Sequence, residues 1–529
     1  MKSIQLPPIF NVATHFVDRH VREGREHKVA FECGEERVTY GQLLERVNRL
    51  GNALKKLSVR QEERVALLLP DTPEFAYCFF GGIKIGAVPV PVNTMLTPTE
   101  YEYILNDCRA RILIVSEVLL AQVQAIPKDN LRYLKTIVVS GKAASAAYSL
   151  QELLDGSSSE LEAEPTRKDD AAFWLYSSGS TGFPKGCVHL HHDMVVCAEL
   201  YAKDVLKITE NDRFFSVAKL FFAYGLGNGL YFSLAVGATS ILWPGSPSPP
   251  NIYSVIERHK PTLFFSVPSN YSSLLSYWRE NGVDFDLSSV RHAVSAGEAL
   301  PAPIFHRFKE RFGVEILDAI GSTEALHMFI ANRPGAVRPG SSGQIMSGYE
   351  AMIVDENGQP VPDGEIGSLL IKGDSVCSSY WNQHEKSKDT IQGHWLRTGD
   401  KYYRDKDGYY WYVGRSDDMM KVKGMWVSPV EVESVLLEHP QVQEAAVIGC
   451  SDGSQLIKPA AYVVLKSGAS GTPQINEEIR LHVSSRLAAH KCPQWLEFVQ
   501  ELPKTATGKI QRYKLRQAGP GPSVPQPAK

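Results

Sequence analysis

The chain has 529 residues, of which 43% are hydrophobic and 22% charged, a usage that is ordinary for globular proteins. This composition excludes a wholly disordered chain, a collagen and a disulfide-stabilised miniprotein, and the length corresponds to several domains. Lys and Arg number 56 and Asp and Glu number 59, so the formal net charge is −3 and no basic surplus points to nucleic acid.

Eight cysteines are spread over the whole length, and none belongs to a Cys-x-x-Cys pair. Reduced core thiols of a cytosolic protein are the expected interpretation. The N-terminal residues are too short and too broken to form a signal peptide, and no apolar run approaches the roughly 18 residues of a membrane span. We therefore expect a cytoplasmic protein without membrane or nucleic-acid partners.

The first third of the chain alternates helical and strand patterns. Apolar spacing predicts helices over 40–57, 73–85 and 98–108 and strands over 64–69 and 112–115. Pro73 suits the first turn of its helix, after Asp71 or Thr72 as the N-cap. The Pro-containing stretch 87–92 is expected to be extended but irregular. This β-α-β rhythm predicts a parallel, doubly wound sheet.

A polar loop over 156–165 precedes a second αβ series, which runs from Ala171 to about Arg333. The segment 334–414 is rich in Gly, Pro and aromatic residues and predicts a small β-barrel-like unit. After Asp417 a capping box with Pro429 at the first helical position opens a further α+β unit, and the Pro/Gly-rich end is expected to be disordered.

We therefore predict an α/β fold in three parts. A large N-terminal domain over 1–416 contains two doubly wound αβ subdomains plus a small β-barrel. A mobile α+β C-terminal domain covers 417–517, and a disordered tail covers 518–529.

The strongest local signal for chemistry is the run Ser178-Gly-Ser-Thr-Gly-Phe-Pro-Lys185-Gly, which follows an apolar strand. Glycines allow backbone N–H groups to turn toward an anion, hydroxyl groups add donors, and Lys185 adds positive charge. The run suits a polyphosphate, but it is not a Walker A loop because Pro184 stands where that loop has Gly. An isolated Ser/Gly cluster would more often be a flexible surface loop.

This run resembles the phosphate loop of the adenylate-forming superfamily, which includes acyl-CoA synthetases, luciferases and the adenylation domains of peptide synthetases. The other motifs of the superfamily follow in order: Gly321-Ser-Thr-Glu324, Arg397-Thr-Gly-Asp400, Gly414-Arg-Ser-Asp417 and Pro503-Lys-Thr-Ala-Thr-Gly-Lys509. The ordered set covers most of the chain. The resemblance implies that a carboxylic acid is joined to the α-phosphate of ATP, with release of pyrophosphate.

The resemblance also implies roles for single residues. Thr323 should contact the α-phosphate, Glu324 should bind Mg²⁺, and Lys509 should bridge the carboxylate and the α-phosphate. Asp417 resembles the hinge about which the small domain rotates, and Gly424 would then admit the arm of coenzyme A. The implied ATP-binding residues are Ser178, Gly179, Ser180, Thr181, Gly182, Lys185, Gly297, Glu298, Asp318, Gly321, Ser322, Asp400 and Arg415.

Two stretches, 218–228 and 316–329, resemble the benzoate-CoA ligases closely. This resemblance implies that Phe222 gates the carboxylate site and that an aromatic ring is lined by Ala223, Tyr224, Gly321, His327 and Met328. A flat ring suits small residues at its edges and an aromatic or thioether wall. Each residue alone would more often be a packing residue, and only the group supports an aryl pocket.

The resulting prediction is an enzyme that ligates benzoate or a close aromatic acid to coenzyme A, using ATP and Mg²⁺. A ligase for a hydroxybenzoate, cinnamate, cyclohexanecarboxylate or medium-chain acid remains open, as does an enzyme that loads a separate carrier protein. A non-catalytic relative would be expected to lack Lys509, Asp400 or Glu324, and all three are present. The resemblance also leaves open a homodimer and a lysine acetyltransferase and deacetylase acting on Lys509.

The run His189-Leu-His191-His192 invites a metal-site interpretation. No Cys or carboxylate set with zinc spacing lies nearby in the sequence. We therefore expect these histidines to be structural.

Overall fold

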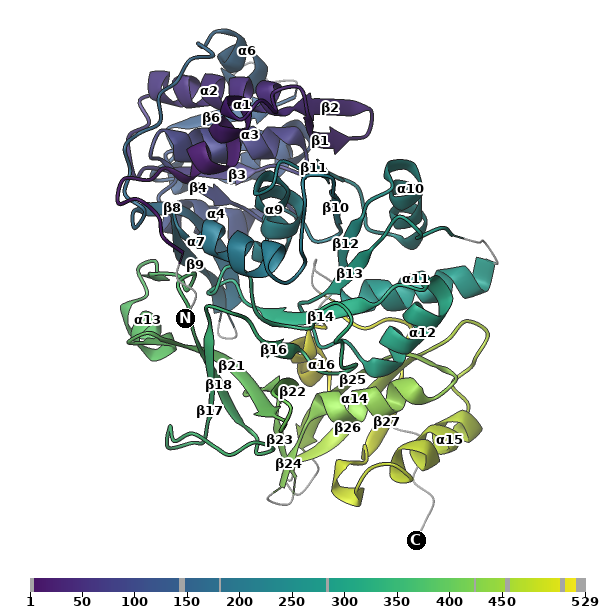
Figure 1. Cartoon of the computed structure of the whole chain (residues 1–529). Coiled ribbons are helices and arrows are strands. Elements are labelled where there is room, and N and C mark those ends of the chain that lie inside the picture. The colour runs from purple at the N-terminus through teal and green to yellow at the C-terminus, as the bar shows by residue number, and fades with distance from the viewer. Residues whose placement is uncertain are drawn as a thin grey trace.

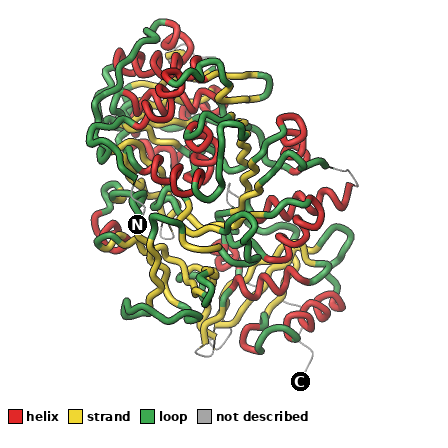
Figure 2. The backbone as a smooth tube through the Cα atoms, viewed as in Figure 1, coloured by secondary structure: helices red, strands yellow, loops and turns green. Residues whose placement is uncertain are grey.

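The computed structural model describes residues 4–141, 148–179, 182–281, 285–422, 425–451, 457–504 and 510–519. Segments from the N-terminal third lie at one end of the molecule and the C-terminal elements lie at the other (Figure 1). Strands form the interior of each part and helices lie over them (Figure 2). Within the described ranges, no helix is both long enough and apolar enough to cross a membrane.

The first αβ unit is built on a five-stranded parallel sheet in the order β4-β3-β5-β6-β7. Its strands are β3 (Arg64–Leu68), β4 (Val88–Pro91), β5 (Ile112–Ser116), β6 (Thr136–Ser140) and β7 (Tyr148–Ser149), and its main helices are α2 (Tyr40–Lys56), α3 (Pro73–Lys84) and α4 (Pro98–Asp107). Helix α2 begins with a full capping box, in which Thr39 and Gln42 exchange hydrogen bonds. These elements confirm the parallel β-α-β prediction.

One expectation for this unit was wrong. Residues 87–92, expected to be irregular, contain the regular strand β4, whose register runs from Arg64↔Val88 to Leu67↔Pro91. The strand occupies the edge of its sheet, where Pro89 and Pro91 need not donate to a further neighbour. The prolines are therefore compatible with regular strand geometry at this position.

The phosphate-loop segment forms a long antiparallel hairpin. Strand β8 (Ala171–Gly179) pairs with β9 (Gly182–Leu190), and β19 (Ser379–Tyr380) adds to the other edge of β9. The apolar strand before the loop therefore continues into a second strand. The pairing with β19 brings residues from around 380 beside the loop.

A 14-stranded sheet spans most of the remaining large domain. Its parallel part contains β10 (Arg213–Ser216), β11 (Thr239–Ile241), β12 (Leu263–Ser266), β13 (His292–Ser295) and β14 (Ile316–Gly321), with β1 (Val29–Cys33) and the antiparallel edge strand β2 (Glu36–Thr39) beyond them. Its antiparallel part contains β15 (Met328–Ala331), β16 (Gly343–Ile345), β17 (Glu350–Val354), β18 (Gly367–Lys372), β20 (Ile391–Gln392), β21 (Trp395–Arg404) and β22 (Tyr409–Arg415). The segment 334–414, predicted as a small β-barrel-like unit, is thus rich in strands, and these strands continue the large sheet from β15.

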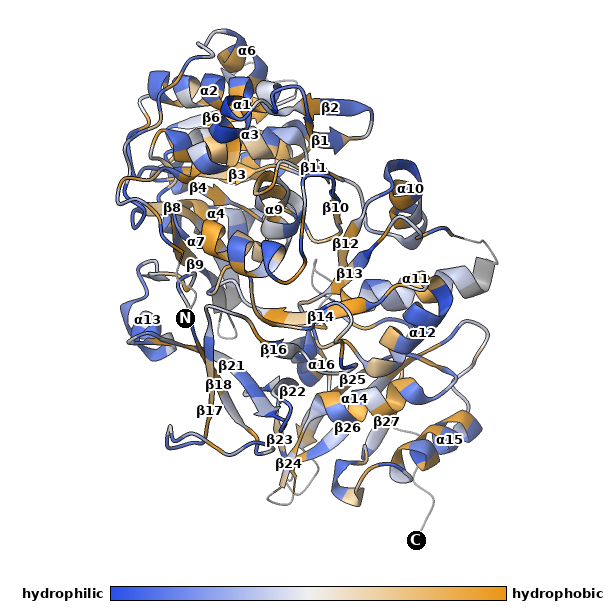
Figure 3. Cartoon of the chain, in the orientation of Figure 1, coloured by the Kyte–Doolittle hydropathy of each residue, from blue (hydrophilic) through white to orange (hydrophobic). Residues whose placement is uncertain are grey.

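Strand β14 is the junction of this sheet. It pairs in parallel with β13 and antiparallel with β15. It is buried and strongly hydrophobic, in contrast to the polar surface helix α13 (His384–Thr390) (Figure 3). The Gly321-Ser-Thr-Glu324 motif leaves the sheet at the carboxyl end of β14, which is where ligands bind in open α/β sheets.

The parallel part is flanked by α10 (Pro249–His259), α11 (Pro268–Asn281) and α12 (Ala302–Phe312). Short helical turns connect β9 to β11: α7 (Asp193–Cys197), the π-helix η4 (Ala198–Lys203), α8 (Ala223–Leu226), the π-helix η5 (Gly227–Tyr231) and α9 (Phe232–Leu234). π-Helical turns are rare and are found frequently at functional sites.

The elements after Asp417 form their own α+β arrangement, as predicted. They comprise a hairpin of β23 (Met420–Val422) and β24 (Met425–Val427), the sheet β25-β26-β27 (Val442–Ser451, Ile457–Leu465, Trp495–Phe498), and helices α14 (Pro429–Glu438), α15 (Pro473–Ser484) and α16 (Arg512–Ala518). Ser428 caps α14 by accepting a hydrogen bond from the Glu431 amide. Helix α14 contacts α12 and β22 of the large domain.

Candidate functional site

The Glu324 carboxylate is held by two hydroxyl groups. Its Oε1 atom accepts hydrogen bonds from Ser177 Oγ at 3.2 Å and from Tyr380 Oη at 2.8 Å. Ser177 lies on β8, beside the phosphate loop, and Tyr380 lies on β19. The β8-β9-β19 sheet therefore places the predicted metal ligand next to the predicted phosphate loop.

Lys185 lies in the same group. Its Nζ is 4.8 Å from the centroid of the Tyr380 ring, which is within range of a cation–π contact. Burial lowers the pKa of Lys185, and the nearby Glu324 carboxylate opposes that shift. A partly desolvated lysine beside a carboxylate is suited to a highly charged anion that replaces water.

The predicted ribose residues form a cross-strand pair. Asp400 on β21 lies opposite Arg415 on β22, and Arg415 Nη1 donates to Asp400 Oδ1 at 3.0 Å. Burial lowers the pKa of Arg415, but Asp400 above all, with a smaller contribution from Glu324, raises it overall. A cavity of about 280 Å³ is lined by Arg397, Gly399, Lys401 and Ser416 among others, but by neither Asp400 nor Arg415. The structure therefore brings these two residues together and close to Glu324.

Asp318 is buried at the carboxyl end of β14. Its Oδ2 accepts a long hydrogen bond of 3.4 Å from the Leu300 amide, while Oδ1 has no partner among the described residues. Burial raises the pKa of Asp318 to about 8. A buried, unpartnered carboxyl oxygen needs a donor, and a bound nucleotide base would supply an amine.

Gly297 and Glu298 lie in the loop between β13 and α12. Gly297 adopts φ +92°, a backbone conformation that favours glycine. The carboxylate of Glu298 accepts a 2.8 Å hydrogen bond from the amide of Ile510, which directly follows Lys509 in the sequence. The loop therefore contacts the C-terminal domain.

The predicted aryl-pocket residues come together around the end of β14. The register pairs Gly321 with Met328, and a methyl group on Gly321 would lie 2.4 Å from the carbonyl oxygen of His327. The Tyr224 and His327 rings are 5.8 Å apart. Ala223 is buried beside Tyr224 at the start of α8, and the preceding Phe222 packs on Phe221.

His327 is almost fully enclosed, as is Met328. It is 2% exposed, and neither ring nitrogen has a partner among the described residues. Burial lowers its pKa to about 3, so the ring is neutral at pH 7. It packs between Tyr201 of η4 and Phe232 of α9, at ring distances of 5.3 and 4.5 Å.

Some predicted residues are not described in full. Ser180, Thr181, Gly424 and Lys509 lie outside the described residues, and only the strand positions of Ser178, Gly179 and Gly182 are given. Asp417 lies in an exposed turn between the two domains. Ser322 Oγ accepts a 3.2 Å hydrogen bond from the Ala325 amide, within its own turn.

The sequence did not reveal Ser177, Tyr380, Tyr201 or Phe232 as site residues. Tyr380 lies 56 residues from Glu324 and reaches it only through the pairing of β19 with β9. Tyr201 and Phe232 read as ordinary core aromatics at helical spacing. No local pattern distinguishes such residues, because their role follows from long-range packing.

The histidine run is packed into the large domain. His189 contacts Asp193, His191 accepts from the Val12 amide, and His192 contacts Lys168 O. In the described ranges, no group of three or more His, Cys, Asp or Glu side chains could hold a metal ion.

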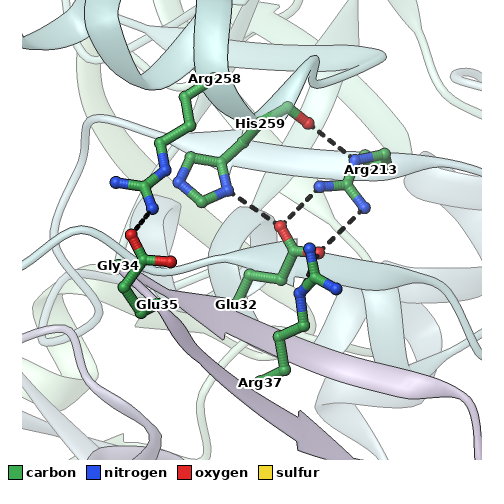
Figure 4. Close-up of a pocket in the computed structure, with 7 residues that line it drawn as sticks. All are labelled: Glu32, Gly34, Glu35, Arg37, Arg213, Arg258 and His259. Atoms are coloured by element: carbon green, nitrogen blue, oxygen red, sulfur yellow. Dashed lines mark hydrogen bonds and ion pairs between the residues drawn. The ribbon is translucent and has the colours of Figure 1, made fainter.

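A surface cavity of about 400 Å³ contains none of the predicted site residues (Figure 4). Glu32 accepts hydrogen bonds there from Arg213 at 2.6 Å and from His259 at 2.9 Å. Burial alone would raise the pKa of Glu32, but these two partners lower it overall. Both carboxylates of this cavity are paired with its own cations, Glu35 with Arg258, so we assign the cavity no part in the reaction.

Family models and similar proteins all point to one enzyme family. Residues 17–381 match the family model "AMP-binding enzyme", and residues 431–509 match "AMP-binding enzyme C-terminal domain". The chain is 47% identical over 518 residues to a benzoate-CoA ligase of Thauera aromatica, covering 98% of this chain and 97% of that protein. It is 43% identical to a 4-hydroxybenzoate-CoA/benzoate-CoA ligase of Rhodopseudomonas palustris, covering 96% and 94%.

Solved structures agree. The anthranilate-CoA ligase AuaEII in complex with anthranoyl-AMP is 47% identical, with a TM-score of 0.94 and coverage of 98% of this chain and 99% of that one. A benzoate-CoA ligase from Burkholderia xenovorans is 46% identical, with a TM-score of 0.88 and coverage of 96% and 100%.

Proposed function

The chain belongs to the AMP-binding enzyme family and, within it, to the benzoate-CoA ligase group, and on that premise we propose that it ligates benzoate or a closely related aromatic acid to coenzyme A. In the first half-reaction a carboxylate oxygen attacks the α-phosphorus of ATP and pyrophosphate leaves. In the second, the thiol of coenzyme A attacks the carbonyl carbon of the acyl-adenylate and AMP leaves.

One observation supports this proposal above the others. The continuous segment Gly321–Met328 carries Thr323 and Glu324 of the nucleotide motif at its start and the pocket residues His327 and Met328 at its end. An acid seated against His327 would therefore present its carboxylate near the phosphates. Holding both reactants in this way accounts for much of the acceleration expected in such a transfer.

We assign a binding role to each charged residue of the site. Lys185 and the phosphate loop hold the phosphates, Asp400 holds the ribose with Arg415 beside it, and Asp318 accepts from the base. Lys509 would bridge the carboxylate and the α-phosphate, where a flexible ammonium group offsets the repulsion between the two anions.

Mg²⁺ suits the oxygen ligand at Glu324. A single carboxylate together with nucleotide phosphates is a usual set for this ion, and its positive charge would reduce the repulsion of the attacking carboxylate. The fixed position of the Glu324 carboxylate, with hydroxyl donors on Oε1, supports this role.

The domain division and the control of Lys509 are also proposals. We place the boundary at Asp417, with the large domain over 1–416 and the C-terminal domain over 417–517. We predict that acetylation of Lys509 silences adenylation, which the activity of a homogeneously acetylated preparation tests. We also predict that the protein forms a homodimer, which its sedimentation behaviour tests.

The deciding experiment measures AMP formation with ATP, Mg²⁺ and free coenzyme A over a panel of acids. The panel contains benzoate, hydroxy-, amino- and fluorobenzoates, cinnamate, cyclohexanecarboxylate and hexanoate. A sharp preference for benzoate and its small derivatives is expected. A flat profile or an aliphatic preference would refute the aryl pocket, and activity only with a carrier protein would refute the acceptor.

A second candidate within the same chemistry is a benzoic acid with an amino or hydroxyl substituent. The unpartnered nitrogens of His327 favour it, because a neutral imidazole offers one donor and one acceptor to the ring edge. The likeness to the anthranilate-CoA ligase points the same way. The substituted acids in the panel separate the two candidates.

A further inference from the structure

The turn that carries Thr323 and Glu324 is held from outside at three successive carbonyl groups. Thr323 O lies 2.9 Å from His189 Nε2, Glu324 O accepts from the Cys377 amide at 2.7 Å, and Ala325 O accepts from Ser375 Oγ at 2.7 Å. These are side-chain and backbone donors from distant parts of the chain. The turn is therefore fixed by its surroundings more than by its own sequence.

The backbone at the end of this turn explains why it needs external support. Leu326 adopts φ +65°, in the left-handed region that costs a residue with a Cβ about 1 kcal/mol or more. Its amide donates to Thr323 O at 3.1 Å, the same oxygen that His189 contacts. The support of Thr323 O thus favours the conformation that aims Glu324 at Tyr380.

His189 is itself fixed by a buried carboxylate. Its Nδ1 lies 2.8 Å from Asp193 Oδ2, which also accepts from the Leu190 amide at 3.1 Å. His189 and Asp193 are both 0% exposed. The imidazole is stacked on Phe173, at a ring distance of 5.2 Å.

The imidazole lies between two oxygen acceptors. Nδ1 faces the carboxylate of Asp193 and Nε2 faces the carbonyl of Thr323, so the ring connects the start of α7 to the turn. The two contacts use different ring nitrogens and can be removed separately.

We propose that His189 and Asp193 are positioning residues for adenylation: Asp193 orients the imidazole, and His189 donates to Thr323 O and so holds Thr323 and Glu324 where the α-phosphate and its metal ion bind. This inference rests on the proposed function. It assigns to the histidine run a role in the reaction that involves no contact with substrate and no metal ligation.

Two substitutions at one position separate the two contacts of His189. The amide nitrogen in H189Q reaches the place of Nε2 and can donate to Thr323 O, whereas that in H189N reaches the place of Nδ1 and can donate only to Asp193. We expect H189N to slow ATP–pyrophosphate exchange by about 10- to 100-fold, as is usual for residues that orient a ligand group. H189Q should recover most of that loss.

The second half-reaction serves as the internal control. Thioester formation from supplied benzoyl-adenylate and coenzyme A should slow by a smaller factor than exchange in H189N, because it needs Thr323 at the α-phosphate of the adenylate but no metal ion at Glu324. The matched control H191N changes a histidine that is 1% exposed and accepts from the Val12 amide. It should lower the thermal unfolding midpoint without separating the half-reactions.

A wild-type rate of ATP–pyrophosphate exchange in H189N would overturn the positioning role. So would an equal loss of both half-reactions, or an H189Q variant that is slower than H189N. If H189N fails to fold, NMR of histidine-labelled wild-type protein decides: a proton on Nε2 of His189 supports the donation to Thr323 O, and its absence overturns it. A wild-type protein that adenylates none of the acids overturns the proposed function instead, and the N–H measurement still tests the donation to Thr323 O.

Discussion

The amide of Ile510 donates a 2.8 Å hydrogen bond to the carboxylate of Glu298. This bond joins the C-terminal domain to the loop between β13 and α12, and that loop also reaches Asp318 through the Leu300 amide. Ile510 is the residue after Lys509. The contact therefore ties the chain next to the proposed bridging lysine to the nucleotide side of the large domain.

We predict that E298A slows adenylation by about tenfold, the equivalent of one hydrogen bond to a charged group. Thioester formation from supplied benzoyl-adenylate should be spared, since it does not depend on holding Lys509 over ATP. Rates of ATP–pyrophosphate exchange and of thioester formation measure the two steps. E310A on the exposed side of α12 is the control, and equal slowing of both steps in E298A would contradict the prediction.

Lys509→Ala should slow the same half-reaction as E298A, and by a larger factor. We expect it to abolish adenylate formation while leaving thioester formation from a supplied adenylate intact, because only the first step needs the ammonium group between two anions. Single-turnover measurements of each half-reaction check this. Equal loss of both would remove Lys509 from its assigned role.

Gly227→Ala should disturb the acid pocket without touching the nucleotide. An added methyl group at this position would lie 2.5 Å from Cδ2 of His327, whose ring is confined by Tyr201 and Phe232. Overpacking of this kind costs about 1 to 3 kcal/mol, so we expect the KM for the aromatic acid to rise by about tenfold.

The KM for ATP should not change in G227A. Gly229→Ala is the matched control, because its added methyl group would meet only the flexible end of Leu220 at 2.9 Å. A G227A enzyme with an unchanged KM for the acid would show that His327 does not bound the pocket.

Asp318 should make stability depend on pH. Burial raises its pKa in the folded protein to about 8, whereas an unfolded Asp titrates near about 4. The folded state holds this proton more tightly, so the contribution to stability is complete below about pH 4 and is lost as the pH rises toward 8.

The variant D318N lacks this titration. Its free energy of unfolding relative to wild type should therefore increase by at most about 1.4 kcal/mol per pH unit between those limits. Urea unfolding without nucleotide, measured in steps across this range, checks the slope. Parallel curves for the two proteins would show that Asp318 titrates normally.

Tyr380→Phe should test the support of Glu324. The variant keeps the ring beneath Lys185 and removes only the hydroxyl that donates to Glu324 Oε1. We expect the Mg²⁺ concentration that gives half-maximal adenylation to rise by about tenfold, with little change in the KM for the acid. S177A, which removes the longer bond, should have a smaller effect, and a Y380F enzyme with the wild-type Mg²⁺ response would contradict the assignment.

The sequence was sufficient for much of this picture. Helix α2 was predictable because its apolar spacing is regular and its capping box is local. The ordered nucleotide motifs located Glu324, Asp400 and Arg415, and the structure brings them together. The edge strand β4 was missed because prolines discourage a strand prediction, and only the sheet order shows that an edge tolerates them.

The sequence could not predict the hydrogen bonds between distant residues that support the site. His189 and Thr323 are 134 residues apart, and Tyr380 and Glu324 are 56 apart. Their contacts depend on how the β8-β9-β19 sheet packs against the end of β14. No local periodicity predicts these contacts, because each residue fits an ordinary pattern in its own helix or strand.

Strand β14 pairs with a parallel neighbour on one side and an antiparallel neighbour on the other, and both the nucleotide motif and the acid pocket begin at its end. A one-residue insertion or deletion there would shift both pairings and turn every side chain to the opposite face. Change in the preferred acid over evolution is therefore confined, in this segment, to replacement of side chains at constant length. Directed libraries that vary His327 and Met328 but preserve the spacing from Glu324 follow the route that the fold leaves accessible.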